Sequence, residues 1–283
     1  MHALVGQMSA EVAALQRALG VTADQRPAPA VSEVAPFEVY LQARTLYEKA
    51  NNLAFEQVRT SEPAPLLPSG NLQPAHVYAL VESARGRLRP VMEELGVAVV
   101  AMPMRIAADT PTEVYKSMVR LHRQVSTLLT RPLEPADVYR LVTQSLAYAL
   151  QLRLRYPGAE PPESPAFEEG KVPADVLVRV QRCFRLVAEL AQSAGVTTLQ
   201  LVADANPEAT PEDVYENASL VIAELRQIHA LSGGPAPVEI PYPGVKTPSD
   251  VFQRVRMLEA ILSELAALAR ADPQRLRGGE SRG

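Results

Sequence analysis

Apolar residues recur along this chain at alternating spacings of four and three positions, the pattern of one buried face on an α-helix. A clear example is the series Val114, Met118, Leu121, Val125 and Leu128. Related series begin at Val5, Val39, Val77, Val138, Val176, Val214 and Val251. A stripe of about five turns corresponds to a helix ~30 Å long at 1.5 Å per residue. The pattern predicts an all-α protein, a helical repeat array or bundle of about eight helices of ~20 residues.

Seven of these series begin with the same motif, a proline followed by two residues and a valine. The prolines are Pro36, Pro74, Pro111, Pro135, Pro173, Pro211 and Pro248. Proline suits the first helical position, where its missing N–H would be unpaired and its φ is already helical. An acid stands two residues after six of the seven prolines, where its side chain can bond the free backbone N–H groups of the helix start. The motif therefore predicts helix starts and gives no sign of an active site.

The spacing of the motif indicates an internal duplication. Successive prolines lie 38, 37, 24, 38, 38 and 37 residues apart, so the short interval falls between Pro111 and Pro135. Taking residues 131–134 as a joint, a three-helix unit at 36–130 maps onto one at 135–231 with offsets of 99, 99 and 100 residues. Residues 1–35 then hold a partial repeat helix, and 232–283 hold a linker, the last repeat helix and a disordered tail. We expect one compact fold, in which long Pro-rich or extended linkers pack along the helices.

Composition and charge narrow the function classes. At 47% hydrophobic and 21% charged residues the chain is typical of a soluble globular protein. No apolar run reaches the ~20 residues of a membrane span. The net charge of −4 argues against nucleic acid as a partner. The basic stretch Arg85–Arg89 alternates its arginines, which predicts a solvated helix face. The start lacks a secretory signal, which favours the cytoplasm, although a trimmed signal would allow the periplasm, so the location is left open.

No residue cluster in the sequence indicates catalysis. Cys183, the only cysteine, occupies an apolar stripe and is interpreted as a core residue. The four histidines lie far apart, so the sequence predicts no metal site, and it predicts no cofactor. Gly-rich phosphate loops and nucleophile or zinc motifs are absent. We therefore expect a protein that is not an enzyme.

One recurrent feature remains as a candidate binding surface, the aromatic residue that follows the motif valine. These residues are Tyr40, Tyr78, Tyr115, Tyr139, Tyr215 and Phe252. Each would lie at the same height near a helix start. The simpler interpretation is a packing residue whose hydroxyl reaches a linker or water, and the alternative is an aromatic-lined groove for a peptide or small ligand.

Elimination and the usual role of repeat surfaces favour a non-catalytic scaffold for protein–protein interaction or self-association. The alternative is a helical bundle that binds a small apolar ligand in a pocket between its two halves. A closed pocket lined by tyrosine and methionine would favour the ligand. A long groove or an exposed apolar patch would favour the scaffold.

Overall fold

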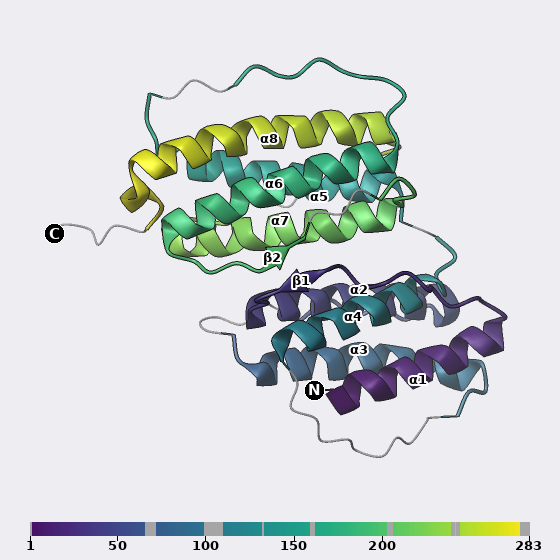
Figure 1. Cartoon of the computed structure of the whole chain (residues 1–283). Coiled ribbons are helices and arrows are strands. Elements are labelled where there is room, and N and C mark those ends of the chain that lie inside the picture. The colour runs from purple at the N-terminus through teal and green to yellow at the C-terminus, as the bar shows by residue number, and fades with distance from the viewer. Residues whose placement is uncertain are drawn as a thin grey trace. The chain divides into compact units, whose positions relative to one another are not determined.

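The chain is helical throughout most of its length. The computed structural model describes residues 2–65, 72–98, 110–131, 133–158, 162–202, 206–238, 241 and 244–277. Within these ranges the helices are α1 (His2–Leu19), α2 (Pro36–Val58), α3 (Pro74–Glu94), α4 (Pro111–Ser126), α5 (Pro135–Arg153), α6 (Pro173–Ala194), α7 (Pro211–Ser232) and α8 (Pro248–Ala271) (Figure 1). The predicted all-α class is confirmed. Among the described residues, no helix combines the length and apolarity needed to cross a bilayer.

Each of α2 to α8 begins at the predicted proline and is capped by nearby side chains. In α4, α7 and α8 a threonine hydroxyl before the proline accepts a first-turn N–H, as Thr110 does from Glu113. In α2 the first-turn side chain reaches back to the residue before the helix, because the Glu38 carboxylate accepts the N–H of Ala35 at 2.8 Å. In α3 the Nδ1 atom of His76 takes the same role toward the N–H of Gln73. The prolines and acids of the motif therefore hold helix ends, as predicted.

The predicted apolar stripes are the buried faces of the helices. All five residues of the stripe that begins at Val114 are buried, including Leu128 just after the end of α4. Ser145 interrupts the stripe of α5, and its buried hydroxyl donates to the backbone oxygen of Leu141 at 3.0 Å. Bonding within the helix satisfies this polar group at little cost to the packing.

The helices group into two compact units of four. The first unit comprises Met1–Pro132 with Leu199–Val202, and the second comprises Leu133–Thr198 with Ala203–Gly283. The boundary lies inside the predicted joint at 131–134, but the predicted units held three helices each. The difference arises because α1 packs against α3 and α4, while α8 packs against α5 and α6, so each outer helix completes a core. That the units form one compact fold remains a prediction.

The two units repeat one plan at a constant offset of 137 residues. Helices α2, α3 and α4 begin at 36, 74 and 111, and α6, α7 and α8 begin 137 positions later, at 173, 211 and 248. The packed pairs α1–α3, α1–α4, α2–α3 and α2–α4 correspond to α5–α7, α5–α8, α6–α7 and α6–α8. The predicted offset of 99 residues does not preserve this packing, because α2 packs against α3 whereas α5 and α6 are not a packed pair. The repeated unit is therefore four helices long.

In the second unit all four helices run parallel. Their starts surround one small apolar pocket at the end of the bundle, lined by Pro135, Val138, Pro173, Val176, Pro211, Val214, Pro248 and Val251. Farther along, Arg153 of α5 bonds Glu264 of α8 at 2.9 Å. Parallel neighbours require a linker that returns over a whole helix length. The linker between α5 and α6 does so along α8, where Gln253 and Arg256 bond its backbone oxygens (Figure 1).

In the first unit, α2 and α4 are also parallel. Gln42 of α2 bonds Tyr115 of α4, and seven residues later Lys49 bonds His122. The linker after α2 packs beside that helix, where the Tyr47 hydroxyl donates to the backbone oxygen of Pro63 at 3.2 Å. This linker is partly outside the described residues, as is the linker between α3 and α4.

Two linkers form a short antiparallel ladder that the apolar pattern did not predict. Strand β1 (Val31–Ser32) precedes α2, and strand β2 (Gln200–Leu201) lies between α6 and α7. Val31 pairs with Leu201 and Ser32 pairs with Gln200. The segment Leu199–Val202 therefore belongs to the first unit, although the chain on both sides of it belongs to the second.

Part of the predicted disordered tail is ordered. After α8 the chain forms a 3₁₀ turn, η1 (Pro273–Leu276), in which Leu276 is buried. The Tyr156 hydroxyl donates to the backbone oxygen of Asp272 at 3.1 Å and fixes the start of this turn. Residues 278–283 lie outside the described residues.

Truncating a stripe residue should destabilise its unit. Leu225→Ala removes a fully buried side chain of α7, so we expect a loss of about 2–5 kcal/mol in the free energy of unfolding. Leu231→Ala on the same helix is the matched control, because Leu231 is 54% exposed and should change stability by less than about 0.5 kcal/mol. Urea unfolding of the full chain measures both. Equal destabilisation by the two variants would contradict the buried stripe.

The thiol of Cys183 should be inert in the folded protein. The side chain is fully buried, and burial raises the pKa of the thiol far above its ordinary value. Because the thiolate is the reactive form, a thiol reagent such as DTNB should leave the native protein unmodified near neutral pH. In urea the same reagent should titrate one thiol per chain. Rapid modification under native conditions would show that α6 does not bury this face.

Candidate functional site

The six aromatic residues predicted as a binding surface are divided between the units. Three lie in the first unit, namely Tyr40, Tyr78 and Tyr115, and three in the second, namely Tyr139, Tyr215 and Phe252. Tyr40, Tyr115 and Phe252 are buried, Tyr78 is about half exposed, and the remaining two are intermediate. Neither unit gathers all six into one surface. That any of them contacts a ligand remains a prediction.

The first unit contains a chain of buried polar side chains between α2 and α4. The Lys49 ammonium bonds Nδ1 of His122 at 3.1 Å. The Nε2 atom of His122 bonds Oε1 of Gln42 at 3.0 Å, and the Gln42 amide donates to the Tyr115 hydroxyl at 3.3 Å. An ammonium can only donate, so Nδ1 accepts and the proton of the imidazole is on Nε2. Each group from Lys49 to Tyr115 then donates to the next, in the order Lys49, His122, Gln42 and Tyr115.

This arrangement keeps His122 neutral. Burial lowers its pKa well below the ordinary value, and the positive charges of Lys49, Arg123 and Arg26 lower it further. A neutral imidazole can accept one hydrogen bond and donate another, which is what its two neighbours require. These hydrogen bonds join α2 to α4 at two successive levels and so fix the register of the two helices.

Sequence reasoning considered His122 only as a metal ligand and missed its partners. Gln42 and Lys49 lie seven residues apart on α2, as do Tyr115 and His122 on α4, so each pair occupies one helix face. Both pairs stand beside the apolar stripe, a position where polar residues are usually solvated. Only the pairing of α2 with α4 brings the four together, and the sequence pattern does not contain that information.

The equivalent contact between helices of the second unit has different side chains. By the offset of 137 residues, Gln42, Tyr115 and His122 correspond to Arg179, Phe252 and Glu259 of α6 and α8. Arg179 bonds Glu259 at 3.2 Å, and the Arg179 guanidinium lies 5.7 Å from the centre of the Phe252 ring. Lys171 lies 4.6 Å from the same ring. A partly exposed ion pair with cation–π contacts thus replaces the buried neutral chain.

Tyr139 is also covered by positive charge. Lys246 and Arg254 lie 4.9 Å and 4.8 Å from the centre of its ring, and Arg254 donates to its hydroxyl. Both cations belong to the start of α8 or the linker before it. These contacts favour the packing interpretation for Tyr139 over an open aromatic groove, because the ring face is already occupied.

The basic stretch Arg85–Arg89 differs from the predicted solvated face. Arg85 is buried and forms a bidentate ion pair with the buried Glu11 of α1, with a shortest distance of 2.7 Å. This pair raises the pKa of Arg85 above its ordinary value. Arg87 is buried beside Glu62 of the linker that precedes α3, and Arg89 remains exposed. The neighbouring helix and linker take up two of the three arginines, which alternation within one helix does not reveal.

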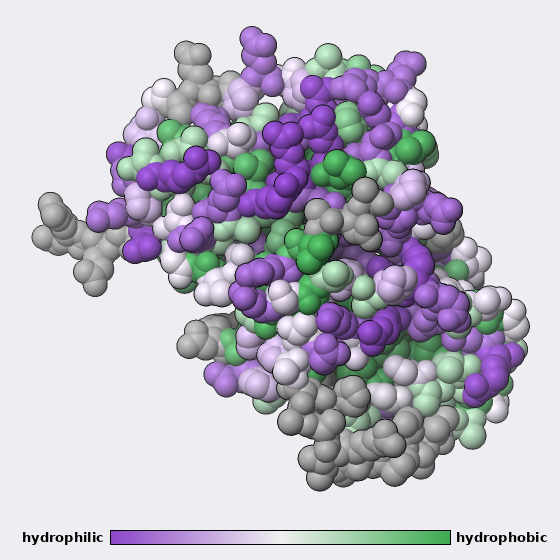
Figure 2. Space-filling view, viewed as in Figure 1, coloured by the Kyte–Doolittle hydropathy of each residue, from purple (hydrophilic) through white to green (hydrophobic). Residues whose placement is uncertain are grey.

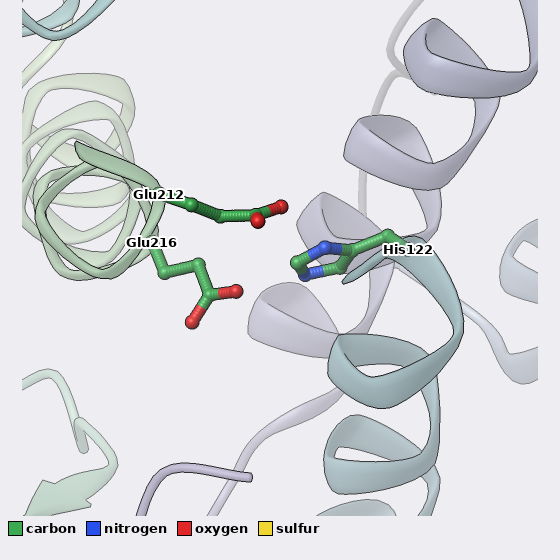
Figure 3. A group of neighbouring side chains, drawn as sticks. All are labelled: His122, Glu212 and Glu216. Atoms are coloured by element: carbon green, nitrogen blue, oxygen red, sulfur yellow. The ribbon is translucent and has the colours of Figure 1, made fainter. Parts of the chain in front are cut away.

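Potential metal ligands among the described residues are divided between the units. Figure 3 shows Glu212 and Glu216 projecting from adjacent turns of α7 in the second unit, together with His122 on α4 in the first. Imidazole and carboxylate groups are common ligands of divalent transition metals. Because the three side chains belong to different units, we assign no metal site to them.

Protonation of His122 should oppose folding. The folded pKa lies below the unfolded value of about 6.5, so unfolding takes up a proton in mildly acidic solution. The stabilisation is complete above pH ~6.5 and is lost as the pH falls below it, by at most ~1.4 kcal/mol per pH unit for one proton. His122→Gln should flatten the dependence of the urea midpoint on pH between 7 and 5. Burial also lowers the pKa of His229, so His229→Gln should flatten the dependence as well, and each variant is compared with the wild type. An unchanged slope in His122→Gln would contradict the buried neutral imidazole.

The described structure thus offers a neutral hydrogen-bonded chain in the first unit and a charged aromatic cluster in the second. Both hold neighbouring helices together, and neither presents the nucleophile, base and orienting group of a hydrolytic site. Comparison with known proteins does not extend this assignment, since no family model, curated protein or solved structure matches the chain.

Proposed function

We propose that this protein is a non-catalytic helical scaffold that binds protein, either a partner or a second copy of itself. The observation that supports the proposal is the exposure of three leucines at the carboxyl ends of α5 and α7, which we call the leucine end. Leu150, Leu154 and Leu231 are 40%, 78% and 54% exposed. Exposed large apolar side chains on two packed helices are candidate contacts for a partner.

The leucine end is held in place by polar contacts between the two helices. Gln151 of α5 bonds Nε2 of His229 on α7 at 2.7 Å. Arg155 donates to the backbone oxygen of Ser232, next to Leu231, and Leu154 immediately precedes Arg155. The leucines therefore stand on rigid helix ends, so binding there requires little ordering of the chain.

The apolar area sets the expected strength of binding. Full burial of one leucine contributes about 1.5–3 kcal/mol, and micromolar affinity corresponds to about 8 kcal/mol. Three leucines with a polar rim thus suit a weak to moderate complex. On the face shown in Figure 2, hydrophobic residues occur in small separate groups among hydrophilic ones, consistent with such small anchors.

Charges placed on the leucine end should weaken binding without unfolding the bundle. We expect the double variant Leu154→Glu/Leu231→Glu to reduce self-association in sedimentation velocity, or retention of a partner in a pull-down, by about tenfold or more. Val245→Glu is the matched control, because Val245 is 91% exposed and lies outside the leucine end. Circular dichroism checks that both variants keep the helical fold. Wild-type binding by the double variant would remove the support for this function.

A further inference from the structure

The segment Leu199–Val202 pairs with the strand edge of the first unit. That edge contacts both the backbone of the segment and one of its side chains. The N–H of Val202 donates to the backbone oxygen of Ala30 at 3.0 Å. The N–H of Leu199 donates to the Glu38 carboxylate at 3.3 Å, and the Leu199 side chain is only 1% exposed. Strand addition of this kind gains affinity from main-chain bonds and specificity from a side-chain pocket.

The second unit contains the same linker geometry without a paired strand in its described part. Glu33 and the equivalent Gly170 both have positive φ, of 57° and 74°. The N–H of Val34 bonds the Thr112 hydroxyl, and the equivalent N–H of Lys171 bonds the Ser249 hydroxyl. The backbone of the linker is therefore formed in both units whether or not a strand is added. Strand pairing is an additional property of the first unit.

The side chains explain why only the first unit accepts a strand. Val31 and Val34 of the first unit are buried, whereas their equivalents in the second unit are Glu168 and Lys171. These two charges pair at 2.7 Å. Charged residues on a strand edge discourage pairing with another chain. The buried valines of this edge are thus specific to the first unit, whereas the Glu38 carboxylate has an equivalent in Asp175.

We propose that this edge is an exchangeable strand acceptor, and that in the self-associated protein a second copy supplies its Leu199–Val202 segment to it. The proposal rests on the proposed self-association. Its occupant is the segment already seen to fit, so every copy carries both the acceptor and its ligand. The exchange is reciprocal and yields a two-fold symmetric dimer.

The ladder is short enough to open. It joins only two residue pairs, and an isolated pair of such strands is marginally stable in water. Val202 is 63% exposed and Gln200 is exposed, so Leu199 provides most of the buried apolar contact. A segment that leaves its own acceptor and binds that of a second copy therefore loses and regains the same contacts. Protein concentration then sets the equilibrium between the monomer and the exchanged dimer.

Disulfide trapping distinguishes exchange from closure within one chain. Ser32 and Gln200 are exposed cross-strand partners, and directly opposed residues of a ladder lie within disulfide range. Tagged Ser32→Cys chains and untagged Gln200→Cys chains are mixed at high concentration and oxidised. We expect a disulfide between tagged and untagged chains at about ten or more times the yield of a control mixture of Ser32→Cys with Ser164→Cys, because paired thiols have a high effective concentration. Equal yields would overturn the proposal.

The double variant Ser32→Cys/Gln200→Cys provides the second measurement. Oxidised in dilute solution, it should form the disulfide within one chain and lose the dimer in sedimentation velocity, and reduction should restore the dimer. If the oxidised variant still dimerises like the wild type, exchange is excluded while self-association stands. If the wild-type protein is monomeric at every concentration, both exchange and self-association are excluded.

Discussion

Four parallel helices can share one core only if the chain returns along the bundle between each helix and the next. This constraint organises the second unit, where all four helix starts meet at one end and the linkers must cover a helix length. It explains why the connections are long, rich in proline and attached to helix surfaces, as at Gln253 and Arg256. In an antiparallel bundle two to eight residues would be enough for each connection. Linkers of this length remain extended at the surface, and one of them supplies β2 to the first unit.

The helix starts and the buried helix faces could be predicted from the sequence because the interactions that determine them lie within one helix. Proline at a helix start and the four-and-three spacing of apolar residues act within one helix, so the starts of α2 to α8 and the buried faces agree with the structure. The grouping of helices was not readable in the same way. Helices α2 to α8 all carry the same motif, so offsets of 99 and 137 residues both align prolines, and only the packing of the helices distinguishes them.

The candidate sites show the same limit. Lys49, His122, Gln42 and Tyr115 stand on two helices far apart in sequence, and their hydrogen-bonded chain exists only when α2 and α4 pack in register. Arg85 was expected in water because alternation describes its own helix, whereas Glu11 reaches it from α1. The two units also show that the same helix arrangement accommodates different side chains at equivalent positions, since the imidazole of His122 is replaced by the carboxylate of Glu259.

The parallel arrangement has an electrostatic consequence. Each helix carries about half a positive charge at its amino end, and in antiparallel bundles neighbouring ends largely cancel. In the second unit four such ends converge, so together they approach two unit charges around one apolar pocket. One aspartate in the first turn of each helix opposes this field, namely Asp137, Asp175, Asp213 and Asp250. These four carboxylates therefore place a counter-charge on the one end of the bundle where all four amino termini lie.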